Sequence, residues 1–450
     1  MVTVANRVTI RNRVALGRVA SRGDAAGKPG RGTFILALFL IILAIPVYFF
    51  IGTIKLSPYR VVLLVMFIPT VLMLLAGKLG PFRLCDLMVL LFSGWGTLAL
   101  FVNHDFDFAL QPGGILIVET VGPYALARYC IRGARQFEVF ARTLFWLIVA
   151  ILPFAIYENI TSHNPILALF GSFASTFAVV EKPPRWGLDQ AQGPFEHPIL
   201  FGVYCGTVFG LALYVIGGKY RRMRRYLPPG TVAVALATSL SSGALTALIT
   251  QTLVATWDRM TRSLARRWAI IGSVLGAMYV FIDLLSTRTP IEVFINYFTF
   301  NYENSYNRIL IWRYGTAEVG RHPLFGIGLS DWERAYYMSP STDMFWLLQA
   351  MQYGLPAAIF LAIAVIYIIA KLSKIDGLDA QTVEYRMGML VAMLGFVVAG
   401  WTVDLWGAIY CLFFFFLGAA VWLFDVPPRA STPASDTLRK AAGSLAAKSV

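Results

Sequence analysis

The sequence predicts an all-α polytopic membrane protein with about 12 transmembrane helices, two of which form a broken or re-entrant hairpin. Hydrophobic residues make up 58% of the 450 positions and charged residues 14%, and the mean hydropathy is +0.66. A soluble domain is far less apolar. The apolar residues form repeated runs long enough to span about 30 Å of hydrocarbon. Most lysines and arginines lie in alternate connections between these runs, as in cytoplasmic loops.

The composition also excludes some functions. The net charge of +14 would suggest nucleic-acid binding in a soluble chain, but the excess of basic residues on cytoplasmic loops explains it here, and no nucleic-acid partner is expected. The cysteines lie inside or at the edges of apolar runs without a close pair, so we interpret them as small packing residues. They are Cys85, Cys130, Cys205 and Cys411.

The first 32 residues are rich in arginine and contain Asp24 as the single acid, which predicts a cytoplasmic tail beside anionic headgroups. Because this polar stretch precedes the first apolar run, that run is expected to be an uncleaved helix. Residues 33–424 are expected to form the transmembrane domain, with periplasmic segments at 158–198 and 286–344. Residues 425–450 form a second cytoplasmic tail.

The predicted spans follow the apolar runs, and the sign of the flanking charges sets their direction. They are Thr33–Ile54, Tyr59–Ala76, Leu84–Val102, Gly113–Ala127, Phe137–Tyr157, Ile199–Gly218, Pro228–Trp257, Trp268–Leu285, Phe345–Ala370, Met387–Trp401 and Trp406–Phe424.

The run Pro228–Trp257 lies between two basic clusters, Lys219–Arg225 and Arg259–Arg267. Both clusters favour the cytoplasm, and a single crossing cannot place both there. A break at Ser241-Ser242-Gly243 resolves the conflict, because two short helices then form a hairpin. Such a broken helix requires protein or a water-filled cavity around it.

Several arginines oppose this charge pattern, because they lie in predicted periplasmic segments. They are Arg185, Arg288, Arg308, Arg313, Arg321 and Arg334. A guanidinium group binds phosphate oxygens bidentately, and several together can stabilise a departing diphosphate. The alternative is that they form ion pairs with nearby acidic loop residues.

Arg308 and Arg313 are five residues apart in a helix-compatible run, about 140° apart around a helix, so they could line adjacent sides of one pocket. Trp186 and Trp312 offer flat faces that suit sugar rings, but an ordinary interfacial aromatic belt is the favoured explanation for most such residues.

Ordered motifs in the second half of the chain resemble those of the O-antigen ligase and polysaccharide polymerase superfamily. They are Arg185 with Gly193, Phe195 and His197-Pro198; Ser241–Ala244; Arg308 with Trp312-Arg313; Pro323–Gly328; and Gly354-Leu355.

The resemblance implies a GT-C-like fold in the bacterial inner membrane, with the active site facing the periplasm. Donor and acceptor would be undecaprenyl-diphosphate-linked glycans, without a nucleotide sugar, cofactor or metal, and polysaccharide export and chain-length proteins are candidate partners. Arg185, Arg308 and Arg313 would neutralise the diphosphate. Members with ligase activity carry a His-Asn pair where this chain has Asp343-Met344, which favours a polymerase. Asp343 would orient or deprotonate the acceptor; alternatively it caps the next helix.

Further candidate residues have weaker patterns. Glu158 could face the same cavity as Arg185, and His197, which precedes a proline, favours a structural turn. Asp105 and Asp107 form an Asp-x-Asp pair that could hold Mg²⁺, although such pairs are common by chance. Intramembrane acids such as Glu119 favour structural ion pairs, but a proton-coupled transporter would also use them.

The function predicted from the sequence is polymerisation of lipid-linked repeat units. The alternatives are a ligase that transfers glycan to lipid A core or another acceptor, and a transporter or flippase of lipid-linked sugars.

Overall fold

The computed structural model describes residues 30–427 except 53, 262–263, 265–266, 287–292 and 294–301, so most of both predicted tails and Arg288 lie outside the described residues. The described chain is mostly helical, and eight of its helices are long and apolar enough to cross a membrane. The predicted class, a helical polytopic membrane protein, is therefore confirmed. The eight are α3 (Pro58–Leu75), α4 (Leu84–Asn103), α6 (Ala134–Thr161), α8 (Pro198–Leu211, extended by a π-helical turn at Ala212–Ile216 and a 3-10 turn at Gly217–Lys219), α11 (Arg267–Leu285), α14 (Phe345–Ser373), α15 (Ala380–Ala399) and α16 (Gly407–Ala420, extended by a 3-10 turn at Val421–Asp425).

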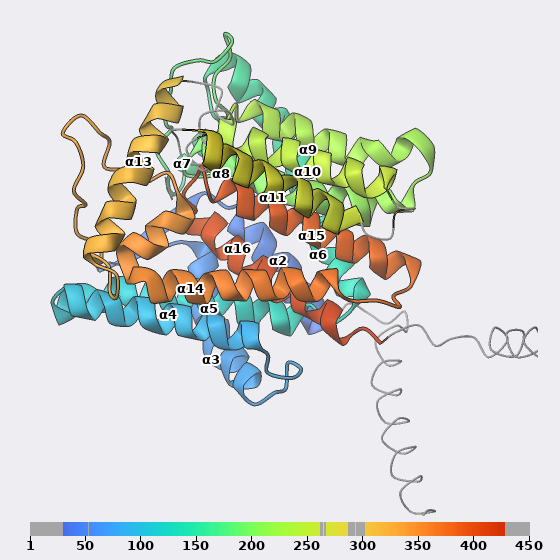
Figure 1. Ribbon diagram of the computed structural model, residues 1–450, viewed down its shortest axis with the longest axis horizontal. Helices are drawn as coiled ribbons and strands as arrows, with labels where there is room; N and C mark the ends of the chain where they lie inside the picture. The colour runs from blue at the N-terminus through green and yellow to red at the C-terminus, as the bar shows by residue number, and fades with distance from the viewer. Residues whose placement is uncertain are drawn as a thin grey trace, which may run out of the picture.

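The described chain also contains shorter or more polar helices. They are α2 (Arg31–Leu43), α5 (Phe106–Cys130), α7 (Pro165–Gly171), a 3-10 turn at Arg222–Tyr226, α9 (Leu227–Thr238), α10 (Ser242–Met260) and α13 (Tyr302–Arg321). In Figure 1 α14 and α15 run side by side, and α13 lies across one end of them.

α16 forms the centre of the core. Its residues Phe413, Phe414, Phe415 and Phe416 are all buried, and Phe415 stacks on Phe39 of α2 with ring centroids 5.3 Å apart. A helix that is apolar on every side is expected to be surrounded by other helices.

The predicted first span Thr33–Ile54 is wrong in its second half. α2 ends at Leu43, and the strands β1 (Val47–Ile51) and β2 (Ile54–Leu56) form an antiparallel hairpin, with β1 also pairing with β3 (Ser175–Thr176). Pro46 cannot donate a helical hydrogen bond, and the aromatic and β-branched residues after it favour a strand. The fold is therefore not entirely helical.

The predicted span Gly113–Ala127 begins too late in the sequence, because α5 already begins at Phe106. The hairpin break, in contrast, is present. α9 ends at Thr238 and α10 begins at Ser242, and Leu240 between them has φ +47°.

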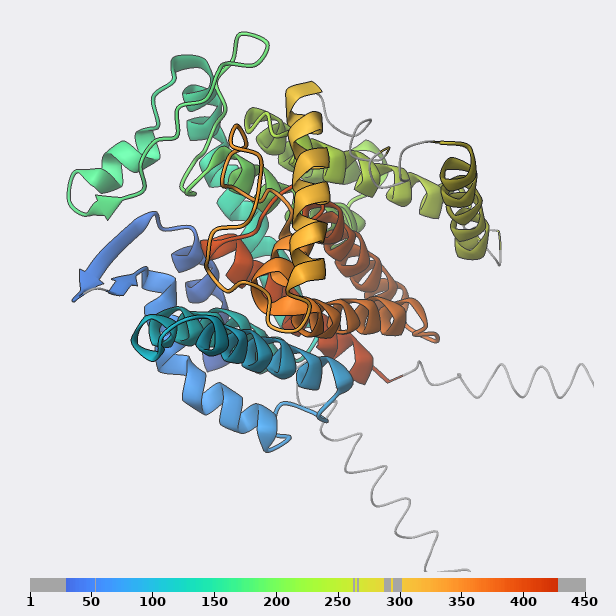
Figure 2. The same cartoon turned by 60° about the vertical axis from the view of Figure 1, so that its left-hand side comes forward.

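The predicted cytoplasmic residues meet at one end of the bundle. Lys219 contacts Glu138, and Arg225 Nη2 lies 2.6 Å from Glu384 Oε2. The hairpin break, the 158–198 segment and α13 are at the other end, where Figure 2 shows α13 standing beside the loops. The contacts therefore place the predicted cytoplasmic connections at one end of the bundle and the predicted periplasmic connections at the other, as the charge pattern predicts.

α14 is kinked at Gly354, whose φ of +82° is non-helical. The kink exposes carbonyls of Met351 and Gln352, which accept hydrogen bonds from the N–H groups of Ile327 and Gly328 at 2.9 Å each. The two glycine-containing motifs noted in the sequence therefore pack directly against each other.

Candidate functional site

Arg308 projects from the buried face of α13. Ile311 and Gly315, which follow it at helical spacing, face α14, and an added Cβ at Gly315 would come within 2.7 Å of Leu347 Cδ2. Arg308 continues this stripe beyond the point where α14 begins, so its guanidinium projects into a pocket instead of onto a helix. It is only 6% exposed. Its Nη1 has no hydrogen-bond partner among the described residues.

A tight turn positions Arg185 across the pocket. The Arg185 N–H donates to Leu188 O at 2.8 Å and the Leu188 N–H donates back to Arg185 O at 3.0 Å. Trp186 and Gly187, the central residues, both have positive φ values, +54° and +79°, as in a type I′ turn. The Arg185 Nη1 group donates to Leu240 O in the hairpin break.

The loop containing Arg185 is held against the hairpin break by backbone groups that α9 leaves free at its end. The carbonyl of Thr238 accepts from the Ala191 N–H at 2.9 Å and from Asn159 Nδ2 at 3.0 Å. A helix leaves its last carbonyls without intrahelical partners, so the break supplies the acceptors that fix the loop.

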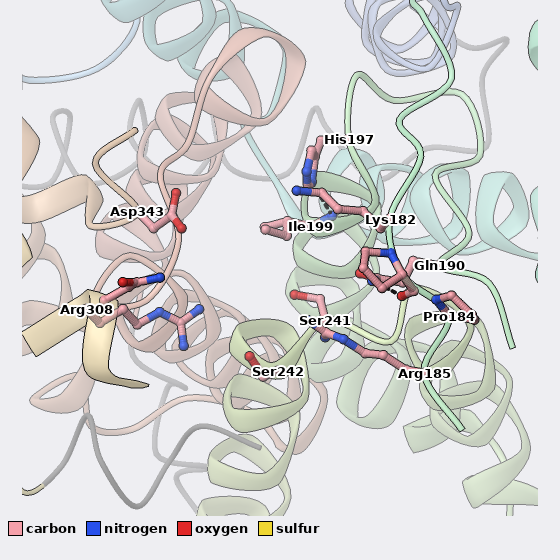
Figure 3. Close-up of a pocket in the computed structure, with 12 residues that line it drawn as sticks. Lys182, Pro184, Arg185, Gln190, His197, Ile199, Ser241, Ser242, Arg308 and Asp343 are labelled. Carbon is pink, nitrogen blue, oxygen red and sulfur yellow. Dashed lines mark hydrogen bonds between the residues drawn. The ribbon is translucent and has the colours of Figure 1, made fainter. Parts of the chain in front are cut away.

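These elements enclose a pocket of about 380 Å³. Figure 3 shows Arg308 and Asp343 on one side and Lys182 and Arg185 on the other. The N-terminus of α10, with Ser242 as its first residue, lies between them. The lining thus carries three cations and one carboxylate, beside a helix N-terminus that also favours an anion.

The charges of the pocket act on one another. Burial lowers the pKa of the Arg308 guanidinium; the Asp343 carboxylate opposes this shift, and the charge of Arg185 adds to it. Burial raises the pKa of Asp343, although Arg308 and Lys182 oppose the shift. An arginine keeps its charge in proteins despite such shifts. The pocket therefore holds closely spaced, partly desolvated positive charges.

His197 lines the pocket as a neutral side chain. Burial, with a contribution from the charge of Lys182, lowers the pKa of His197 to about 4. Its Nδ1 accepts a hydrogen bond from the Ile199 N–H at 3.1 Å, capping α8. The predicted structural role in a turn is confirmed, and the residue also forms part of the pocket wall.

Other predicted site residues lie outside the pocket lining. Arg313 is exposed on another face of α13, and Trp312 packs near Trp401 with ring centroids 6.1 Å apart. Arg321 Nη2 contacts Glu318 Oε2 at 2.5 Å. The five-residue spacing therefore separates Arg308 from Arg313 instead of directing both into one pocket.

Glu158 is buried behind the pocket. Its carboxylate accepts from the N–H groups of Gln192 and Gly193, at 2.9 Å each, and from Asn164 Nδ2 at 3.0 Å. It thus fixes the loop. Trp186, at the tip of the turn, is 75% exposed and stands outside the lining, next to Arg185.

The weaker candidates lie away from the pocket, and Glu119 among them has structural partners. Glu119 accepts from Arg60 Nε at 2.6 Å and from the Tyr59 hydroxyl at 2.9 Å, so the predicted ion pairing is confirmed. His104, the residue before the Asp-x-Asp pair, accepts a hydrogen bond at Nε2 from the Leu329 N–H at 2.8 Å. Asp105 precedes α5, and no group of three or more histidine, cysteine or acidic residues within the described ranges could hold a metal ion.

Sequence reasoning missed three polar residues of the lining: Lys182, Gln190 and Asn307. Lys182 could have been predicted in the same way as Arg185. It is a basic residue in the same predicted periplasmic loop, where the positive-inside pattern does not expect one. Asn307 and Gln190 had none, since polar loop residues are common.

Comparison with known proteins gives no further assignment. No protein-family model matches the chain, and no curated protein matches it at a significant level. The geometry of the pocket therefore remains the main indication of function.

Proposed function

We propose that this protein is a membrane glycosyltransferase that binds the diphosphate of a lipid-linked saccharide in the pocket. The observation that carries the proposal is the buried Arg308. Its Nη1 has no protein partner among the described residues, and the side chain shares the pocket with Lys182 and Arg185. A buried donor without a partner is costly, and a phosphate oxygen would satisfy it. A lipid diphosphate brings such oxygens to the end of a helical bundle in a membrane.

The reaction follows from the residues present. An acceptor hydroxyl attacks the anomeric carbon, and a new glycosidic C–O bond forms as the bond to the diphosphate breaks. The electron pair leaves with the diphosphate, whose charge Arg308, Arg185 and Lys182 stabilise. The hydroxyl proton passes to the ionised carboxylate of Asp343. Charge stabilisation dominates, because a diphosphate is already a good leaving group.

The finer topology belongs to the same proposal. We assign the enzyme to a bacterial inner membrane, with about 12 helices counting α9 and α10 separately, a GT-C-like arrangement, and the pocket in the periplasm. The grouping of basic residues at the opposite end supports this orientation. Donor and acceptor are undecaprenyl-diphosphate-linked units, joined into exopolysaccharide or O-antigen.

The transport alternative has less support. A flippase needs a polar route through the bundle, yet the centre of α16 is a run of buried phenylalanines, and Glu119 is already neutralised by Arg60. A ligase remains the second candidate, because the same donor pocket serves any acceptor hydroxyl.

The test is chain growth in membranes supplied with lipid-linked repeat units. Wild type should build a ladder, and Arg308→Ala should slow it by about 100-fold to 1,000-fold, as for removal of a group that stabilises transition-state charge. Arg334→Ala is the matched control, because Arg334 lies in the same long segment but pairs with Asp331. Transfer to another acceptor without lengthening would indicate a ligase. Equal rates for wild type and Arg308→Ala would refute the assignment of this pocket as the diphosphate site.

A further inference from the structure

A second basic cavity lies at the other end of the bundle. It has a volume of about 460 Å³, and its cations are Arg142, Lys219 and Arg224. Ile199 lines the first pocket and Ile216 lines this one. These two residues are separated along α8 and its extension by roughly 25 Å at 1.5 Å per residue. The two cavities are therefore separate sites at opposite ends.

One carboxylate organises two of the cations. Arg142 Nη2 lies 2.6 Å from Glu138 Oε1, and Lys219 contacts the same oxygen. The Tyr385 hydroxyl donates to Glu138 Oε2 at 3.1 Å, which fixes the carboxylate from the other side. Glu138 thus holds two cations in place but neutralises only one of the three positive charges.

The cavity opens beside exposed apolar surface. Trp146 of α6 is 62% exposed and Leu227 at the start of α9 is 67% exposed, and both line the cavity. Tyr220, also in the lining, is 51% exposed. Tryptophan and tyrosine concentrate where hydrocarbon meets headgroups. A phosphate in this cavity would therefore have apolar helix faces next to it.

We propose that this cavity binds the phosphate-bearing headgroup of an anionic phospholipid, whose acyl chains lie along the outer faces of α6 and α9. The three cations supply the charge complementarity. Free phosphate shares the headgroup chemistry, but it would leave the exposed tryptophan and leucine without a partner. This inference does not depend on the proposed glycosyltransferase activity, because the two sites are at opposite ends of the protein.

The experiment is native mass spectrometry of the purified full-length protein with added phosphatidylglycerol, phosphatidylcholine or inorganic phosphate. We compare wild type with the triple variant Arg142→Gln, Lys219→Gln and Arg224→Gln. The matched control neutralises three basic residues of other predicted cytoplasmic connections. These are Arg132, Lys371 and Lys374.

The pocket variant should bind phosphatidylglycerol about 100-fold more weakly than wild type, since each cation near the membrane surface contributes about a fivefold effect. The control should stay within about twofold. The site would be overturned if the pocket variant and the control variant lost phosphatidylglycerol equally. It would also be overturned if wild type retained phosphatidylcholine as well as phosphatidylglycerol. Binding of inorganic phosphate with no preference for the lipid would overturn the lipid assignment.

Two single substitutions keep the test decisive if the triple variant fails to fold. Arg224→Gln leaves the Glu138 contacts intact and should weaken phosphatidylglycerol binding about fivefold. Glu138→Gln keeps a side-chain oxygen as acceptor for Arg142 and Lys219 but removes the opposing charge, so it should strengthen phosphatidylglycerol binding. A result without these opposite signs would contradict the proposal.

Discussion

Arg308 in α13 and Asp343 in the loop just before α14 face the same pocket, and each offsets part of the cost of burying the other. The carboxylate opposes the burial that lowers the pKa of Arg308, and the guanidinium opposes the burial that raises the pKa of Asp343. Removing either residue leaves a desolvated charge behind. In the proposed reaction Arg308 binds the departing diphosphate, while Asp343 accepts the proton of the acceptor hydroxyl. The same pair of opposite charges therefore serves both the departure of the leaving group and the activation of the acceptor.

The pH dependence of chain growth should follow Asp343. The carboxylate must be ionised to accept a proton, and burial raises its pKa, so the rate should fall with decreasing pH at values above those of an ordinary aspartate. Because the charge of Lys182 lowers this pKa, Lys182→Met should move the acid limb to higher pH. Rate–pH profiles of the two proteins test this. An unmoved limb would remove Asp343 from the base role.

Trp186 should bind a sugar ring and not stabilise the fold. Its positive φ is unfavourable for a bulky residue, and Trp186→Gly relieves that strain, so the melting temperature should stay equal or rise. The KM for the acceptor should rise about fivefold, as expected for losing one aromatic contact. Kinetics and thermal melts of the same preparation separate the effects. A lowered melting temperature with unchanged KM would contradict the assignment.

Asp404 should make stability depend on pH. Burial raises the pKa of Asp404 to about 7, whereas an unfolded aspartate titrates near 3.9. The folded state therefore retains a proton that the unfolded state has lost, and this contribution is complete below about pH 4 and disappears as pH rises through about 7. Melting temperatures in detergent between pH 5 and 8 should fall less steeply in Asp404→Asn. Parallel curves would rule out this contribution.

Gly354→Ala should prevent correct folding. The new Cβ would lie 2.1 Å from the Leu324 carbonyl oxygen, at a φ of +82°, so the loop of residues 323–328 could not dock on α14. Gly94→Ala is the control, because nothing lies within 4 Å of a Cβ added there inside α4. Size-exclusion profiles of the detergent-extracted variants give the measurement. A monodisperse, normally stable Gly354→Ala protein would show that folding does not require residues 323–328 to dock closely at Gly354.

Sequence patterns predicted the long apolar helices because length and hydropathy decide them, and the hairpin break because two basic clusters required it. They failed at Pro46, where the chain turns from helix to strand within one apolar run. In the pocket, Arg185 and Arg308 were predicted from their charge in predicted periplasmic segments, whereas Asp343 was predicted only from its place in the resemblance to the ligase and polymerase superfamily. Arg313 was misplaced because which face of α13 is buried depends on packing against α14, and no pattern within α13 itself specifies that contact.

The kink at Gly354 also sets the depth at which the pocket operates. α14 has 29 residues, too many for a hydrocarbon layer of about 30 Å, but the part after the kink, Leu355–Ser373, measures roughly 28 Å and matches that layer. The part before the kink packs against the 323–328 loop and against α13. In the proposed orientation, Asp343 and Arg308 lie beyond this part of α14, on the side of the headgroups. With the proposed lipid-linked donor, the polyprenyl tail would stay dissolved in the bilayer while its diphosphate reaches Arg308 and Arg185.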